Sequence, residues 1–116
     1  MIVRVFTGRV AIRREGDFNQ RLRPRLAEIR AAHGNRYAKF ARKIDGDRER
    51  VILITEWASA ADLYDWAGPR VDEPRFVDLS LLDEWQVEHW EALDIDPERE
   101  GASELPPPDG GGGSGS

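Results

Sequence analysis

Four stretches of the chain carry the residue pattern of β-strands. Residues 1–12 (MIVRVFTGRVAI) are rich in β-branched and aromatic side chains and end at turn-forming residues. Residues 35–44 (NRYAKFARKI) and 49–57 (ERVILITEW) flank an Asp-Gly pair, which favours a tight hairpin because glycine tolerates a positive φ. Residues 84–93 (EWQVEHWEAL) alternate in polarity, which predicts a fourth strand. One face of that strand would carry Trp85, Val87 and His89, and the other Gln86, Glu88 and Trp90.

The segment between the first two predicted strands has the periodicity of a helix. Its predicted buried face has helical spacing and consists of Phe18, Leu22, Leu26, Ile29 and His33. We expect Asp17 to cap the N-terminus and Gly34 to end the helix. Because Pro24 lies inside the pattern, the helix either kinks there or restarts with Pro24 in its first turn.

A second, shorter helix is predicted after the third strand. Ser59 is a good N-cap, and Asp62 three residues later forms a variant of the capping box. Leu63 and Trp66 are spaced to face inward, and Gly68 ends the helix. The following stretch, 70–83, fits either a short helix or a loop, and the sequence leaves this open.

The predicted element order, βαββαβ, is typical of the ferredoxin-like arrangement in the α+β class. That fold has one four-stranded antiparallel sheet with two helices on one face. The strands at 1–12 and 49–57 are apolar on both faces, whereas two helices cover only one. We therefore expect a second copy of the chain to cover the open face in a symmetric homodimer.

Composition narrows the classes of protein further. The chain has 116 residues and no cysteine, so it is expected to be one cytoplasmic domain without disulfides. Its longest aliphatic run, Val51–Ile54, is far too short to span a membrane. Residues 1–50 carry 14 basic and 6 acidic side chains, whereas residues 51–93 carry 2 and 10. Because the halves neutralise each other, we expect no nucleic-acid partner. The short aliphatic run likewise leads us to expect no membrane partner.

The last 23 residues differ in composition from the rest. Residues 94–116 contain six acids, one arginine, a triple proline and a Gly/Ser run, with few apolar side chains. Such a segment buries too little apolar surface to offset the conformational entropy lost on ordering, so it is expected to be a flexible tail or linker. The domain is therefore predicted at residues 1–93. The terminal GGGGSGS fits a native spacer or an expression linker equally well.

The element order and three stretches resemble the antibiotic biosynthesis monooxygenase (ABM) domains of the dimeric α/β-barrel superfamily. The stretches are ILITEWASAADLYDWAG, LRPRLAEIRAAHGNRYAKFARKI and WQVEHWEAL. Members of that family include oxygenases that oxidise anthrones and quinols without metal or flavin, haem-degrading enzymes and small proteins of unassigned role. The resemblance implies a ligand pocket between the helices and the sheet of each protomer.

The resemblance also implies candidate site residues. His89 would be the catalytic base, because its ordinary pKa lets it accept a proton near neutral pH. Arg9 would stabilise an anionic oxygen. The pocket walls would be Trp57, Trp66, Phe6 and Trp90. Each of these has a plain structural alternative: the aromatic side chains as core packing, His89 as a strand or dimer contact, and Arg9 as a partner of an acid.

Haem fits the sequence less well. The resemblance to haem-degrading members of the family would imply an asparagine on the first strand and an iron-binding histidine after the third. Here Arg9 aligns with the asparagine, and no histidine occurs between Trp57 and His89. Two histidines without cysteine also make a metal site improbable. Three functions follow as alternatives: a cofactor-independent monooxygenase, a module that binds a hydrophobic molecule or haem without catalysis, and a dimeric interaction protein tethered through its tail.

Overall fold

The computed structural model describes residues 1–74 and 78–93. The elements in chain order are β1 (Ile2–Val10), α1 (Glu15–Ala31), β2 (Asn35–Asp45), β3 (Arg48–Trp57), α2 (Ala60–Ala67), a 3-10 helix η1 (Leu79–Leu81) and β4 (Leu82–Glu91). The predicted order βαββαβ is confirmed. In the stretch that the sequence left open, 70–83, the described residues contain the single turn of η1 and the first two residues of β4.

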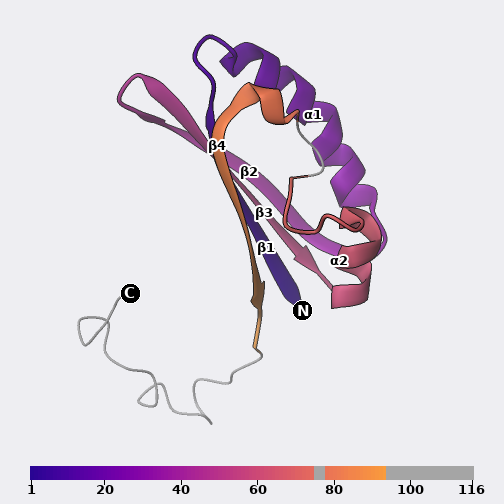
Figure 1. Ribbon diagram of the computed structural model, residues 1–116. Helices are drawn as coiled ribbons and strands as arrows, with labels where there is room; N and C mark the ends of the chain where they lie inside the picture. The colour runs from indigo at the N-terminus through magenta and orange to yellow at the C-terminus, as the bar shows by residue number, and fades with distance from the viewer. Residues whose placement is uncertain (75–77, 94–116) are drawn as a thin grey trace, which may run out of the picture.

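The four strands form one antiparallel sheet in the order β2-β3-β1-β4. Figure 1 shows α1 and α2 on the same side of this sheet. The ferredoxin-like α+β fold is therefore confirmed. β1 and β3 lie in the centre, and β2 and β4 form the two edges. The charged strand β2 lies at an edge, where lysine and arginine discourage stray strand pairing.

The two faces of the sheet are buried to different extents. On the helix-covered face, the side chains of β1 and β3 are almost completely buried: Arg4, Phe6, Val10, Val51, Leu53, Thr55 and Trp57. They pack against Phe18, Leu22 and Ile29 of α1 and Leu63 of α2 to make the core. On the open face, Val3, Val5, Ile52 and Ile54 alternate with these residues and remain half-buried.

Helix α1 corrects the predicted N-cap and the predicted place of His33, and it decides between the two alternatives left open at Pro24. Its N-cap is Arg14, and Asp17 lies inside the first turn, where its carboxylate pairs with Arg14 at 3.1 Å. The helix continues through Pro24 without restarting. Pro24 is exposed, so the carbonyl that loses its hydrogen bond can face water. Because the helix ends at Ala31, the side chain of His33 lies beyond it and is 94% exposed, off the buried face.

The turn between α1 and β2 requires glycine. Gly34 has a φ of 83°, and a Cβ there would lie 2.3 Å from the side chain of Asp62. Helix α2 follows its predicted boundaries, because the hydroxyl of Ser59 accepts a hydrogen bond from the Asp62 amide at 3.1 Å. Gly68 caps its end with a φ of 77°. Asp62 therefore belongs both to the cap of α2 and to the packing of the preceding turn.

The predicted tail, residues 94–116, lies outside the described residues, and the boundary after residue 93 stays a prediction. Within the described part of the chain, no helix combines the length and apolar character needed to cross a membrane.

Candidate functional site

Trp57, the last residue of β3, stacks on Trp66 of α2. The rings of Trp57 and Trp66 are 5.0 Å apart between centroids, with 29° between their planes. Trp57 is fully buried, and its indole N–H donates to the hydroxyl of Thr55 at 3.0 Å. The proximity expected for the two rings is therefore present. Because Trp57 and Phe6 are 0% and 1% exposed, they fill the space between helices and sheet themselves.

A buried arginine, which the sequence analysis missed, completes this cluster. Arg4 is 2% exposed, and its guanidinium carbon lies 5.4 Å from the ring centroid of Trp66, in cation–π range. It donates to the backbone oxygen of Val71 at 2.6 Å and to that of Glu73 at 2.8 Å. Arg4 therefore ties the segment after α2 to the central strand.

His89 faces Arg4 across the β1–β4 pair. The two are register partners, and Nη1 of Arg4 lies 2.9 Å from Nε2 of His89. Because a guanidinium only donates, Nε2 must accept, which assigns the neutral tautomer with its proton on Nδ1. Desolvation and the positive Arg4 lower the pKa of His89, against the opposing effect of Asp72. His89 is therefore held as a neutral base.

Burial also affects Arg4. Desolvation lowers the pKa of its guanidinium to about 10, against the raising effect of the nearby negative Asp72. Arg4 thus stays charged at neutral pH, in surroundings where a cation is costly. Its Nε is buried without a hydrogen-bond partner among the described residues. Arg4 is therefore a positive charge fixed in the interior beside His89.

The edge of this cluster along β4 is accessible. Trp85, Val87 and His89 lie on the helix-covered face, opposite Gly8, Phe6 and Arg4 of β1. Trp85 is 37% exposed, Val87 is partly buried and His89 is exposed. The structure therefore offers a partly apolar surface beside the Arg4–His89 pair, above a filled interior.

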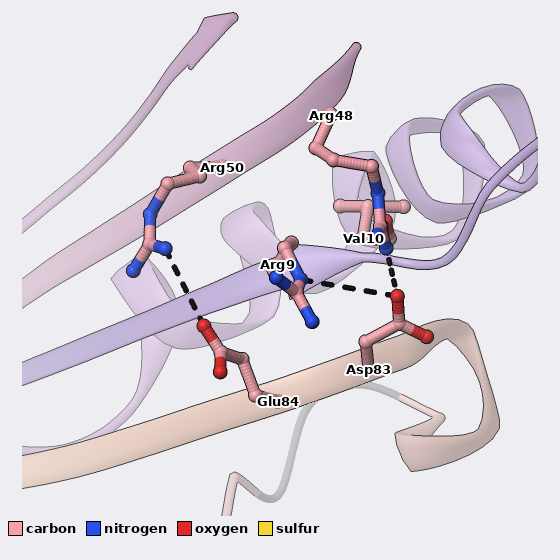
Figure 2. Close-up of polar contacts among 6 residues, drawn as sticks. All are labelled: Arg9, Val10, Arg48, Arg50, Asp83 and Glu84. Carbon is pink, nitrogen blue, oxygen red and sulfur yellow. Dashed lines mark hydrogen bonds and ion pairs between the residues drawn. The ribbon is translucent and has the colours of Figure 1, made fainter. Parts of the chain in front are cut away.

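Arg9 lies on the other face of the sheet. Its register partners are Arg50 and Glu84, and its guanidinium Nε lies 3.8 Å from the carboxylate of Asp83. Figure 2 shows Arg9 and Arg48 pointing toward that same carboxylate, while Arg50 pairs with Glu84. The alternative that Arg9 pairs with an acid matches this placement.

Trp90 is also separated from the cluster. It lies opposite Val3 on the open face and is 58% exposed. The six candidate residues therefore do not form one site. The helix-covered face carries His89, Trp57, Trp66 and Phe6, and the open face carries Arg9 and Trp90. Adjacent residues of a strand point to opposite faces, so His89 and Trp90 cannot line the same hollow of one protomer.

The described residues contain no cluster of three or more histidine, cysteine, aspartate or glutamate side chains arranged to hold a metal ion.

Comparison with known families identifies the chain at this point. The model of the antibiotic biosynthesis monooxygenase family matches residues 1–69, more than half of the sequence. The chain belongs to this family. The match includes Arg4, Trp57 and Trp66 and ends before the strand that carries His89. Among curated proteins, none matches the chain.

Solved structures agree with this assignment at the level of fold. An antibiotic biosynthesis monooxygenase-type protein of Deinococcus radiodurans has a TM-score of 0.68 at 14% identity, covering 83% of this ABM chain and 96% of the other. The haem-degrader MhuD of Mycobacterium tuberculosis, with two haems bound in its active site, has a TM-score of 0.59 at 18% identity. It covers 83% of this chain and 100% of its own.

Proposed function

We propose that this ABM protein is a small cofactor-independent monooxygenase that oxidises an aromatic phenol, quinol or anthrone. The observation that supports it is the contact between the buried cation Arg4 and the neutral His89, beside an accessible aromatic surface. Formation of a phenolate requires a base that accepts the proton and a cation that stabilises the anion, and here the two are joined by one hydrogen bond. Arg4 takes the role that the sequence resemblance gave to Arg9, because Arg9 faces the other side of the sheet.

The first step would be a proton transfer at His89. Nε2 accepts a proton from the substrate, the hydroxyl proton of a phenol or quinol or a CH₂ proton of an anthrone, which turns the imidazole into an imidazolium and the substrate into its anion. Protonation of Nε2 breaks its hydrogen bond with the Arg4 N–H. That N–H can then donate a hydrogen bond to the new oxyanion. The lowered pKa keeps His89 unprotonated at neutral pH, so the base is available before substrate arrives.

The oxidation balances without a cofactor. In an anthrone the reactive CH₂ group loses two hydrogens and gains one oxygen atom, which gives the quinone. The second oxygen atom of O₂ leaves as water with those two hydrogens, one of them returned by the imidazolium of His89. The substrate anion supplies the electrons, so no external reductant enters. The protein's part is to form that anion and to limit access of bulk water.

The aromatic substrate would lie against β4 and α2. Trp85 and Val87 offer a partly exposed apolar surface next to His89, and Trp66 is partly buried behind it. Trp57 and Phe6 would support this surface from below, since both are buried in the core. This arrangement places the ring at the rim of the predicted hollow, because the interior is already filled.

Oxygen uptake with anthrone as substrate tests the proposal. We expect His89→Ala to lower kcat by about 10²- to 10⁴-fold, the usual contribution of a positioned base. His33→Ala is the matched control, because that histidine is exposed beyond the end of α1. Activity that survives His89→Ala unchanged, or the absence of turnover in the wild type, would contradict the proposal.

Haem binding without catalysis is the second candidate, and the likeness to haem-bound MhuD favours it. The residues present fit haem poorly, because no histidine occurs between Trp57 and His89, the region where the resemblance to haem-degrading members would place the iron-binding histidine. No step is therefore assigned to haem. Titration with haem, followed by quenching of tryptophan emission, separates the candidates: tight binding without anthrone oxidation would favour the second.

We also propose that the protein is a homodimer joined through the open face. Val3, Val5, Ile52 and Ile54 form an apolar strip there, and the neighbouring Tyr37 and Trp90 are 42% and 58% exposed. A contiguous apolar surface of this kind marks an interface. Both helices lie on the other side, as Figure 1 shows, so a second copy is the simplest cover.

Sedimentation equilibrium at micromolar concentration measures this association. Ile52→Lys places a charge in the strip and should shift the protein to monomer. Ile44→Lys is the control, because Ile44 is 69% exposed near the hairpin end and lies on the other face of the sheet. A wild-type protein that sediments as a monomer would rule out the dimer.

A further inference from the structure

A groove runs between α1 and the edge strand β2, away from the Arg4–His89 pair. It encloses about 380 Å³, which is within the usual range of small-molecule sites. Its walls contain both apolar and polar side chains. The apolar part consists of Leu22, Leu26 and Phe40, and the polar part of Asn19, Arg23 and Arg42.

The floor of the groove is the side of the core that α1 leaves uncovered. Leu22 is buried, whereas Leu26 and Phe40 are only partly covered. The ring of Phe40 lies 6.2 Å from that of Phe18 between centroids and is tilted by 38°, so the core fixes its position. An apolar ligand would therefore meet a rigid aromatic and aliphatic floor without displacing core residues.

The groove carries a net positive charge after the ion pair between Arg42 and Glu49 is taken into account. The carboxylate of Glu49 is 3% exposed and accepts from Arg42 at 3.2 Å and from Asn19 at 3.3 Å. That acid is thus buried and already occupied by two donors. Arg42 keeps a side chain that is 58% exposed, and Arg23 forms no ion pair with any described residue.

We infer that this groove binds a small amphiphilic carboxylate, with its apolar chain on Leu26 and Phe40 and its carboxylate between Arg23 and Arg42. A guanidinium matches a carboxylate with parallel hydrogen bonds, which a neutral alcohol cannot reproduce. A cationic amphiphile would face two arginines. The site lies apart from the proposed oxygenase residues and is independent of that activity.

Calorimetric titration with dodecanoate, below its micellar concentration, tests the inference. Arg23→Gln should weaken binding by about 5-fold, the scale of a partly exposed ion pair. Arg25→Gln is the matched control: it lies on the same helix, and its guanidinium pairs with Glu28 at 2.9 Å. Dodecanol has the same chain without the charge. Its affinity for the wild-type protein should be no higher than the affinity of dodecanoate for Arg23→Gln.

Two further variants locate the ligand. Leu26→Trp adds volume to the groove and should abolish dodecanoate binding while anthrone oxidation persists. Ile52→Lys alters the open face and should leave binding unchanged. Arg42→Gln is less useful because it leaves Glu49 buried without its cation. Equal binding by wild type and Arg23→Gln, or loss of binding in Ile52→Lys, would overturn the inference.

Discussion

The two faces of the sheet use the same strands for different purposes. On β1 and β3 the side chains under the helices are buried to within a few percent, and the alternate side chains on the open face remain half-buried. Both sets are largely apolar. On the helix-covered face the apolar side chains are buried by α1 and α2, whereas on the open face apolar side chains have no element of the described part of the chain packed on them. The pattern of apolar residues along a strand therefore does not tell which of its faces is buried within the monomer.

Their charges differ in the same way. On the helix-covered face, the buried Arg4 is held by backbone oxygens and by His89. On the open face, Arg9 and Arg50 face each other across the β1–β3 pair and are balanced by acids at the surface, as Figure 2 shows. An arginine fixed in the interior has a set geometry, while exposed pairs are weak and adaptable. This contrast supports the choice of Arg4 over Arg9 for chemistry.

Removal of the buried tryptophan should produce the largest loss of stability. Trp57→Ala deletes a fully buried ring and its stacking on Trp66, and should lower the free energy of unfolding by about 3–5 kcal/mol. Urea denaturation followed by circular dichroism measures this. If the free energy of unfolding fell by less than about 1 kcal/mol, the helix-covered face would not be the packed core of the protein.

Arg4→Met should have the next largest effect. The substitution keeps much of the side-chain volume but leaves the backbone oxygens of Val71 and Glu73 without their donor, at a cost of about 1–3 kcal/mol. The segment after α2 should then lose protection in hydrogen exchange. Arg9→Met, on the open face, should leave that protection unchanged. Equal exchange in the two variants would contradict the link between Arg4 and this segment.

Stability should also depend on the protonation of His89. Its pKa is lowered in the folded state, so below about pH 6.5 the unfolded chain binds more protons than the folded one. Stability should therefore fall as the pH drops through this region, and then level off below the folded pKa. Thermal melts between pH 5 and 8 measure the trend. His89→Gln should flatten it, whereas a slope that persists in this variant would assign the effect to another group.

Trp90→Ala should have the smallest effect on the fold. Because Trp90 is 58% exposed on the open face, the free energy of unfolding of the monomer should change by about 0.5 kcal/mol or less. The same substitution should weaken self-association in sedimentation experiments. Compared with Trp57→Ala, it separates a tryptophan of the core from one of the proposed interface. A large loss of monomer stability would erase the distinction between the faces.

The sequence was sufficient for the fold because its local preferences agree with one another. The Asp-Gly hairpin, the Ser59 cap and the alternation along each strand are all present in the structure. Local rules were less reliable within α1. Asp17 has the residue type of a cap, yet the chain enters the helix earlier, and Pro24 is tolerated because its side of the helix is exposed.

The candidate site was harder to predict because it depends on distant contacts. Arg4 is buried by backbone oxygens that follow it by 67 and 69 positions, which no periodicity in β1 reveals. One indication was available, because Arg4 alternates with Phe6 and so shares its face. The same alternation separates Trp90 from His89. Alignment to a family pattern suggested Arg9, and strand geometry would have argued against it.

The position of β1 in the middle of the sheet has a consequence for biosynthesis. Its two neighbours, β3 and β4, begin only at Arg48 and Leu82, so β1 is translated long before either can pair with it. Pairing over such sequence separations slows folding. On the ribosome this strand, apolar on both sides, can pair with β3 midway through synthesis, but its other edge stays open until β4, the last part of the sheet, has emerged.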